Sequence, residues 1–213
     1  MNGIENKIPK QIIYAWFGGG QKTRLIEKCI DSWKRIIPDY KIIELNEKNC
    51  NIERYNYSKK AYEEKKWAFV SDCMKLDYLY ENGGIVFDAD VEVLKPFSDE
   101  ILNNRAFTSK ESAGRWISAV WGAEIHHPWI KSILKYYKQN EFIYDPARIC
   151  NTTIIHNINQ KWYKKTEGNI IYLHEDVTIY PSDYFECKNW ANGLIETTKN
   201  SYTIHHYTAS WLK

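Results

Sequence analysis

In the first third of the chain, the order of hydrophobic and polar residues indicates both strands and a helix. Residues 11–17 and 41–45 are apolar runs typical of buried strands. Between them, apolar residues recur every three to four positions over residues 23–36, which predicts an amphipathic helix that ends before Pro38. Strand, glycine-containing loop, helix and strand in this order predict a βαβ unit with parallel strands.

The rest of the chain continues this alternation. A broad apolar stripe over residues 67–82 predicts a helix, ended by Gly83 and Gly84, and a shorter helix is expected over 59–66. Residues 46–58 have no readable period, and residues 151–155 fit either a strand or a helix. Further strands are expected at 85–87, 91–94, 107–108, 118–123, 170–173, 177–180 and 203–207, and a helix at 129–137 after Pro128. The pattern predicts a single α/β domain, residues 1–213, with a Rossmann-like, mixed but mostly parallel sheet flanked by helices.

Composition narrows the function classes. The 213 residues include 29 basic and 27 acidic side chains, a net charge of +2, which is too balanced to predict a nucleic-acid partner. The five cysteines contain no C-x-x-C spacing, so neither a disulfide framework nor a zinc site is expected. No run of 18 apolar residues occurs, and residues 1–10 lack the apolar core of a signal peptide. We therefore expect a cytoplasmic protein.

The most distinctive short motif is Asp88-Ala89-Asp90, which follows the apolar strand at residues 85–87. If the backbone stays extended there, Asp88 and Asp90 point to one face and can share a cation. Two carboxylates that close repel each other unless a positive group lies between them. A chain of this length contains roughly one Asp-x-Asp by chance. The motif therefore indicates a function only if other segments supply residues to the same site.

Such partners occur in two distant segments. Trp16 and Phe17 precede three glycines at 18–20, and two histidines at 205 and 206 precede Ser210 and Trp211. If these segments meet the Asp-x-Asp motif at the carboxyl edge of one sheet, they form a site for an aromatic base, a ribose, a metal and a diphosphate. Carboxylate and phosphate oxygens are preferred by Mg²⁺ and Mn²⁺, and Mn²⁺ also accepts imidazole.

Three stretches in this order resemble the DXD-motif sugar transferases. This family includes bacterial capsular-polysaccharide glycosyltransferases, the fungal initiating mannosyltransferase and, more remotely, the large clostridial glucosylating toxins. The stretches are Ile8-Pro9-x-x-Ile12-x-Tyr14-x-Trp16-Phe17-Gly18-Gly19, Ala68-Phe69-x-Ser71-Asp72 through Leu79-Tyr80-x-x-Gly83-Gly84-x-x-x-Asp88-x-Asp90-Val91, and Ile204-His205-His206-x-x-x-Ser210-Trp211. The resemblance implies a GT-A fold, Mn²⁺ or Mg²⁺ as cofactor, and a nucleotide-sugar donor.

The resemblance also implies roles for individual residues. Trp16 stacks on the donor base, with Phe17 and Gly18 also counted as donor-binding. Asp72 holds ribose or sugar hydroxyls. Asp88, the first catalytic aspartate, is shared between metal and donor, and Asp90 ligates the metal directly.

The C-terminal motif completes the implied site. His206 is placed near the metal, while His205, which points to the opposite face of a strand, ranks below it. Ser210 and Trp211 are assigned to the diphosphate. One position departs from the family: Lys75 stands where Arg is usual, three residues after Asp72, and offers a point charge to the donor in place of a planar fork.

The expected function is a retaining glycosyltransferase. The sugar, a hexose or N-acetylhexosamine, moves from a nucleotide-sugar donor, with UDP preferred as carrier, to a glycan or lipid-linked oligosaccharide in bacterial surface or capsular polysaccharide synthesis. A C-terminal tail beyond Lys213 would provide peripheral attachment to the inner face of the membrane. No unassigned carboxylate stands out as a nucleophile beyond Asp176, so front-face attack is favoured.

Two alternatives remain open. The apolar strand followed by Asp88 and Asp90 also fits a haloacid-dehalogenase-like phosphatase, in which Asp88 is the nucleophile and Asp90 the general acid. A metal-dependent carbohydrate-binding module without catalysis would explain the many aromatic residues.

Overall fold

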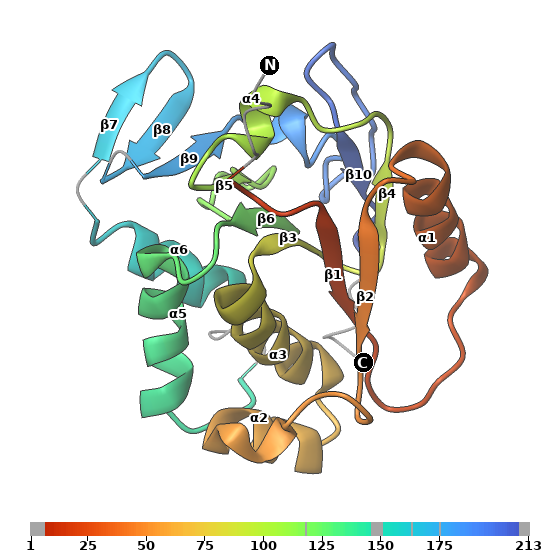
Figure 1. Ribbon diagram of the computed structural model, residues 1–213, viewed down its shortest axis with the longest axis vertical. Coiled ribbons are helices and arrows are strands. Elements are labelled where there is room, and N and C mark those ends of the chain that lie inside the picture. The colour runs from red at the N-terminus through yellow and green to blue at the C-terminus, as the bar shows by residue number, and fades with distance from the viewer. Residues whose placement is uncertain (1–6, 118, 146–150, 163, 175, 209–213) are drawn as a thin grey trace, which may run out of the picture.

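The computed structural model describes residues 7–208 except 118, 146–150, 163 and 175. In this part of the chain, eight strands form one sheet with helices on both faces (Figure 1). The order across the sheet is β2 (Lys41–Leu45), β1 (Gln11–Ala15), β3 (Gly84–Phe87), β6 (Val120–Ala123), β5 (Ala106–Ser109), β9 (Val177–Tyr180), β8 (Ile170–Leu173) and β7 (Lys164–Glu167).

Strand directions agree with the predicted mixed, mostly parallel sheet. β1 is parallel to both β2 and β3, and β5 is parallel to β9. β6 and β8 are antiparallel to their neighbours and run against the other six strands. β10 (Thr203–His205) and β4 (Val91–Val93) form a separate antiparallel pair. The carboxyl ends of β1, β2 and β3 therefore share one edge of the sheet, where ligands of such folds bind.

The predicted βαβ unit is confirmed. Helix α1 (Arg24–Ile36) lies between β1 and β2, and the Thr23 hydroxyl caps it by accepting from the Ile26 N–H at 3.4 Å. The Trp33 indole N–H on its buried face donates to the Val91 carbonyl at 2.7 Å. This bond fixes α1 against β4.

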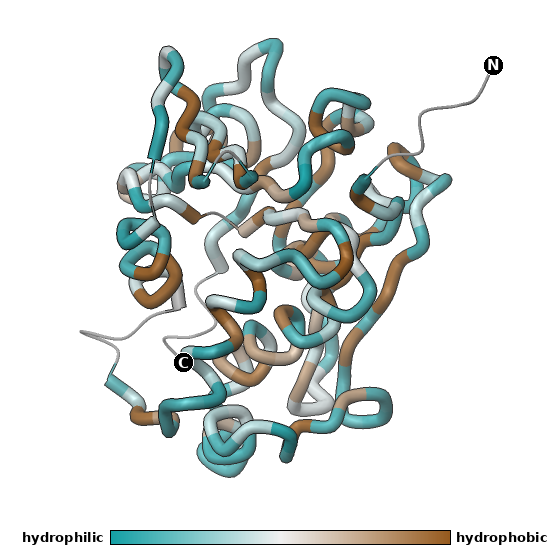
Figure 2. Tube along the Cα trace, turned by 60° about the vertical axis from the view of Figure 1, so that its left-hand side comes forward, coloured by the Kyte–Doolittle hydropathy of each residue, from teal (hydrophilic) through white to brown (hydrophobic). Residues whose placement is uncertain are grey.

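Two hydrophobic cores lie on opposite faces of the sheet because successive strand residues alternate between them. Ile13 and Val86 point into the first core, while Ile12 and Ile85 point into the second. The first core is covered by α2 (Asn56–Glu63), α3 (Trp67–Asn82) and α5 (Pro128–Gln139), and the second by α1, β4 and α4 (Asp99–Leu102). Turns at the top and bottom of the molecule are largely hydrophilic (Figure 2).

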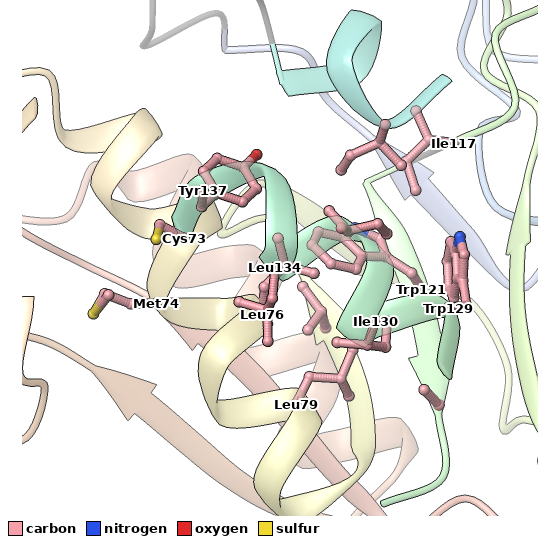
Figure 3. Packing of buried hydrophobic residues seen from close by; sticks show 14 of the residues in the cluster. Cys73, Met74, Leu76, Leu79, Ile117, Trp121, Trp129, Ile130, Leu134 and Tyr137 are labelled. Atoms are coloured by element: carbon pink, nitrogen blue, oxygen red, sulfur yellow. The ribbon is translucent and has the colours of Figure 1, made fainter. Parts of the chain in front are cut away.

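Helix α3 has the predicted bounds and places the residues before the Asp-x-Asp motif. Its residues Leu76 and Leu79 face Ile130 and Leu134 of α5 (Figure 3). The helix ends at Gly83, whose φ is +65°, and β3 begins at Gly84, whose φ is +114°. A Cβ at Gly84 would lie 3.0 Å from the Gln11 carbonyl oxygen, so both the backbone angle and the close packing on β1 require glycine.

Elsewhere the structure extends the sequence predictions. Helix α2 begins at Asn56, inside the stretch without a readable period, and α6 (Asn151–Asn159) shows that residues 151–155 are helical. β7 and α4 are short elements that the pattern did not predict. None of the helices in the described part of the chain combines the length and apolar character needed to span a bilayer.

Candidate active site

The Asp-x-Asp motif forms a turn between β3 and β4. The Val91 N–H donates to the Asp88 carbonyl at 3.1 Å, and the Asp88 N–H donates to the Ala119 carbonyl at 3.1 Å. The backbone therefore does not stay extended at this point, so the condition for the two aspartates to share one face of a strand is not met. The two carboxylates lie near each other because the chain turns back on itself after β3.

Strand β10 brings a histidine to this turn. His205 pairs with Val91 in the β10–β4 register. The His205 Nε2 atom lies 3.3 Å from Asp90 Oδ1 and 3.8 Å from Asp88 Oδ2. One ligand atom from each of the three residues can be chosen so that all lie within 4.8 Å of one another.

The structure places His205, and not the higher-ranked His206, beside Asp88 and Asp90. The His206 Nε2 atom lies 2.9 Å from Glu92 Oε2, and this carboxylate also accepts from Lys28 at 2.9 Å. Consecutive strand residues do point to opposite sides, as expected. Which of the two faces Asp88 and Asp90 depends on the register of β10 against β4, and this register has no signature in the sequence.

The Asp90 carboxylate is buried and ionised. Its Oδ2 atom accepts from the Thr208 backbone N–H at 2.7 Å and from the Thr208 hydroxyl at 2.9 Å. Burial by itself would raise the pKa of Asp90, but the charge and hydrogen bond of His205 and the two Thr208 donors hold that pKa well below its usual value. Residues just after β10 thus bind the motif directly.

His205 is held from its other side by Glu186, which the sequence analysis did not identify. Glu186 is buried, and its Oε2 atom lies 3.3 Å from His205 Nδ1. Its carboxylate also accepts from the Ala119 N–H at 2.6 Å and from the Tyr207 hydroxyl. Burial lowers the pKa of His205, but the carboxylates of Glu186 and Asp90 outweigh this effect and raise it well above its usual value.

Lys75 connects the two predicted donor-binding aspartates. Its ammonium lies 2.7 Å from Asp72 Oδ1 and 2.6 Å from Asp88 Oδ1, and its side chain is buried. Burial by itself lowers the pKa of Lys75. The two carboxylates raise it by more than burial lowers it, so the pKa lies above its usual value and the lysine is charged. The ammonium offsets part of the negative charge of the two aspartates. We call Asp72, Lys75, Asp88, Asp90 and His205 the charged cluster.

The predicted base-binding segment follows β1 at the same sheet edge. The Trp16 indole N–H donates to the Gly20 carbonyl at 2.7 Å, and the Gly18 N–H donates to Glu47 Oε1 at 2.6 Å. Phe17, in contrast, is buried in the first core. We call residues 16–20 the glycine loop. The predicted diphosphate ligands Ser210 and Trp211 lie outside the described residues.

A small cavity opens beside the charged cluster. It has a volume of about 70 Å³. Its walls include three members of the cluster, two glutamates and six uncharged residues, namely Asp72, Asp88, His205, Glu111, Glu186, Ile117, Ala119, Trp121, Thr152, Ile155 and Tyr207. Asp176 is not among them, and its carboxylate instead pairs with Arg105 at 2.9 Å.

The chemistry of the cluster fits a divalent cation. Asp88 and Asp90 offer hard carboxylate oxygens, and His205 offers an imidazole nitrogen, a donor set that suits Mn²⁺ and also accommodates Mg²⁺. The outer nitrogen of His205 faces the Glu186 carboxylate, as is usual for histidines that ligate metals.

Comparisons with known proteins agree with this geometry. Residues 23–108 match the family model described as the glycosyltransferase sugar-binding region containing the DXD motif. The solved structure of the PaToxG glycosyltransferase is similar to this chain at 17% identity, with a TM-score of 0.57 over 72% of this chain and 68% of that one. A glycosyltransferase involved in glycosylation of the major capsid of PBCV-1 gives 13% identity and a TM-score of 0.52, covering 93% and 94% of the two chains. No curated protein gives a significant match.

The matched region contains Asp72, Lys75, Asp88 and Asp90, and it ends in β5. The structural similarities, at this low identity, concern the fold, and they confirm the predicted GT-A architecture. Residues 23–108 are thus similar to the DXD-containing sugar-binding region of glycosyltransferases, and they lie within a GT-A type fold.

Proposed function

We propose that the protein is a metal-dependent, retaining glycosyltransferase. It takes a hexose or N-acetylhexosamine from a nucleotide sugar, with UDP as carrier, and transfers it to a glycan or lipid-linked oligosaccharide of a bacterial surface or capsular polysaccharide. The observation that carries the proposal is the Asp88, Asp90 and His205 group at a cavity on the carboxyl edge of the sheet.

Asp88, Asp90 and His205 would hold the Mn²⁺ or Mg²⁺ ion. When bound, such an ion acts as a Lewis acid and offsets the negative charge that develops on a diphosphate leaving group. Thr208 and Glu186 keep Asp90 and His205 in place from outside this group. These contacts support a site that is organised before the donor arrives.

The donor would span the two neighbouring strand ends. Trp16, partly exposed after β1, stacks on the base, and the Gly18 backbone lies beside it. Asp72 lines the cavity and accepts hydrogen bonds from sugar or ribose hydroxyls. Because the Lys75 ammonium pairs with Asp72 and Asp88, we assign it the role of positioning these carboxylates.

The carboxylates around the cavity favour front-face attack over a covalent intermediate. Glu186 accepts hydrogen bonds from Ala119 and Tyr207, and Glu111 pairs with Arg115 at 2.8 Å, so neither is poised as a nucleophile. In front-face attack the acceptor hydroxyl forms the new bond to the anomeric carbon while the bond to the diphosphate breaks. The acceptor proton passes to a leaving phosphate oxygen, and the anomeric configuration is retained.

We further propose that the reaction takes place in the cytoplasm, with peripheral attachment to the inner face of the membrane. The balanced charge and the absence of a long apolar run in the sequence support a cytoplasmic location. The match to the glycosyltransferase region favours a transferase over a phosphatase or a non-catalytic module.

The direct test is a screen of UDP- and GDP-sugars for slow hydrolysis with and without Mn²⁺. We expect wild-type protein to release sugar from at least one donor in a Mn²⁺-dependent manner. Asp90→Asn should lower this rate at least about a hundredfold, as expected for loss of a direct metal ligand. Asp176→Asn, which removes a carboxylate outside the cavity, is the matched control and should retain the wild-type rate. Release from no donor, or full activity of Asp90→Asn, would overturn the proposal.

A further inference from the structure

A loop beside the cavity presents apolar side chains to solvent. Residues 188–196 lie in the connection between η2 (Ser182–Tyr184) and β10, and in this loop Trp190 is 63% exposed, Leu194 54% and Ile195 45%. We call this segment the tryptophan loop. Exposed apolar side chains that cluster in this way often mark binding sites.

Hydrogen bonds hold the tryptophan loop in a defined shape. Lys188 and Ile195 form an antiparallel β-bridge, and the Asn189 N–H donates to the Leu194 carbonyl at 2.8 Å. The Asn189 carbonyl accepts from Gly193 at 2.8 Å, and its side-chain oxygen accepts from Ala191 at 2.8 Å. The backbone that carries Trp190 is therefore fixed, which lowers the entropy lost when a ligand binds.

The tryptophan loop is continuous with the cavity. The backbone N–H of Trp190 donates to the Ser112 hydroxyl at 3.4 Å. This hydroxyl lies 3.5 Å from the hydroxyl of Tyr207, a cavity residue. The Lys188 ammonium donates to the His206 carbonyl at 2.7 Å. The loop is thus attached to the strand end that carries His205.

The size of the cavity implies that substrate extends beyond it. Its volume of about 70 Å³ is far below the about 300 Å³ or more of a usual small-molecule pocket. It accommodates the reacting atoms but not a complete oligosaccharide. The remaining part of an acceptor must lie on the surface outside the cavity, and the tryptophan loop is joined to the cavity residue Tyr207 through Ser112.

We propose that the tryptophan loop is the acceptor subsite, with a sugar ring of the acceptor stacked on Trp190. This inference rests on the proposed function. An indole offers a flat apolar face to the C–H side of a sugar ring and costs little side-chain entropy to order. The charged residues of the loop are Lys188 and Glu196, whose opposite charges give a net charge of zero. Because the loop has no net positive charge, a neutral saccharide is favoured over an anionic membrane surface.

The binding test uses the indole N–H signals of ¹⁵N-labelled protein, with Trp190→Phe to assign the Trp190 signal. Wild-type protein with UDP and Mn²⁺ is titrated with lactose, maltose, cellobiose and chitobiose. We expect at least one disaccharide to shift the Trp190 signal. Trp190→Ala should weaken binding of that sugar, followed through the other shifted signals, about tenfold, and Trp190→Phe should weaken it less. Ile125→Ala removes a 50% exposed side chain from the β6–α5 turn and should leave binding unchanged.

The activity test separates this inference from the proposed function. Trp190→Ala should raise the KM for the acceptor sugar about tenfold while donor hydrolysis continues at the wild-type rate. A Trp190 signal that no disaccharide shifts, together with unchanged transfer by Trp190→Ala, would overturn the subsite. Loss of binding to anionic lipid vesicles by Trp190→Ala, with normal kinetics on a soluble acceptor, would overturn it as well. A shifted Trp190 signal in a protein that hydrolyses no donor would support a saccharide-binding site at Trp190 but refute the transferase and, with it, the role of this site as an acceptor subsite.

Discussion

The charged cluster and the glycine loop lie at the ends of neighbouring parallel strands but are held in place by different means. The charged cluster is held by contacts with residues far away in the sequence, such as Thr208, which binds Asp90 from 118 positions away. In the glycine loop, the Trp16 indole donates to a carbonyl four residues away, and Gly18 and Gly19 take backbone angles that other residues rarely adopt. One part of the site depends on tertiary charge pairing and the other on local backbone geometry.

The largest effect should follow from removing the central charge of the cluster. Lys75→Met leaves Asp72 and Asp88 without their shared cation beside the core, and we expect the free energy of unfolding to fall by about 3 kcal/mol or more. Urea denaturation measures this change. Lys75→Arg keeps the charge and should lose less. If Lys75→Met loses less than about 1 kcal/mol, charge pairing does not stabilise the cluster.

The loss of stability at acid pH also tests charge pairing in the cluster, because protonation of the carboxylates removes it. The contribution of His127 must first be separated from this effect. Burial is the main cause that lowers the pKa of His127 to about 4, whereas the unfolded chain binds the proton near pH 6.5. The unfolded state is therefore favoured as pH falls through this range, and about 3 kcal/mol of stability should be lost between pH 6.5 and 4.

The matched variant for this titration is His127→Asn, which keeps an acceptor for the Trp129 N–H at the start of α5. Chemical denaturation at several pH values should show a flatter profile for the variant between pH 6.5 and 4. The remaining acid sensitivity then reports on the carboxylates. An unchanged profile would mean that His127 does not contribute.

A substitution at Glu186 tests whether contacts between residues far apart in the sequence also determine the affinity for a metal ion. Glu186→Gln keeps the shape but removes the charge next to His205 Nδ1, and we expect the affinity for Mn²⁺ to fall tenfold to a hundredfold. Electron paramagnetic resonance of free Mn²⁺ measures this without any substrate. Glu111→Gln, on another wall of the cavity, is the control. Equal Mn²⁺ binding by wild type and Glu186→Gln would contradict a role in positioning His205.

The smallest effect is expected in the glycine loop. A Cβ at Gly18 would lie 2.6 Å from the Trp67 indole, and φ there is +85°, whereas Gly19 has φ +66° and open space around it. Gly18→Ala should cost about 1 kcal/mol of stability because the exposed loop can shift, and Gly19→Ala should cost less. Thermal unfolding of both variants measures the difference. If both variants lose the same stability, the contact between a Cβ at position 18 and the Trp67 indole does not contribute to the cost.

The same contrast explains what the sequence could predict. The βαβ unit, α3 and the Asp-x-Asp motif follow from local periodicity and from residues within one segment, and the structure confirms these elements. The choice between His205 and His206 depends on how β10 pairs with β4, and the role of Glu186 depends on contacts with Ala119 and Tyr207. A single sequence carries no record of such pairings.

Lys75 illustrates an intermediate case. Its position three residues after Asp72 is visible in the sequence, because residues at this spacing share a helix face. Its second partner, Asp88, belongs to the next element and becomes apparent only when α3 packs beside β3. The structure thus shows Lys75 in an internal ion pair with both aspartates, while its contact with the donor stays a prediction.

The antiparallel pairing of β10 with β4 has a consequence for synthesis of the protein. Ribosomes make the chain from the N-terminus, and segments can begin to fold as they emerge. Asp88 and Asp90 are therefore available long before His205 and Thr208, and a nascent or prematurely terminated chain that lacks β10 has an incomplete metal-binding group. Late arrival of this strand would keep unfinished chains from carrying out the sugar transfer that we propose.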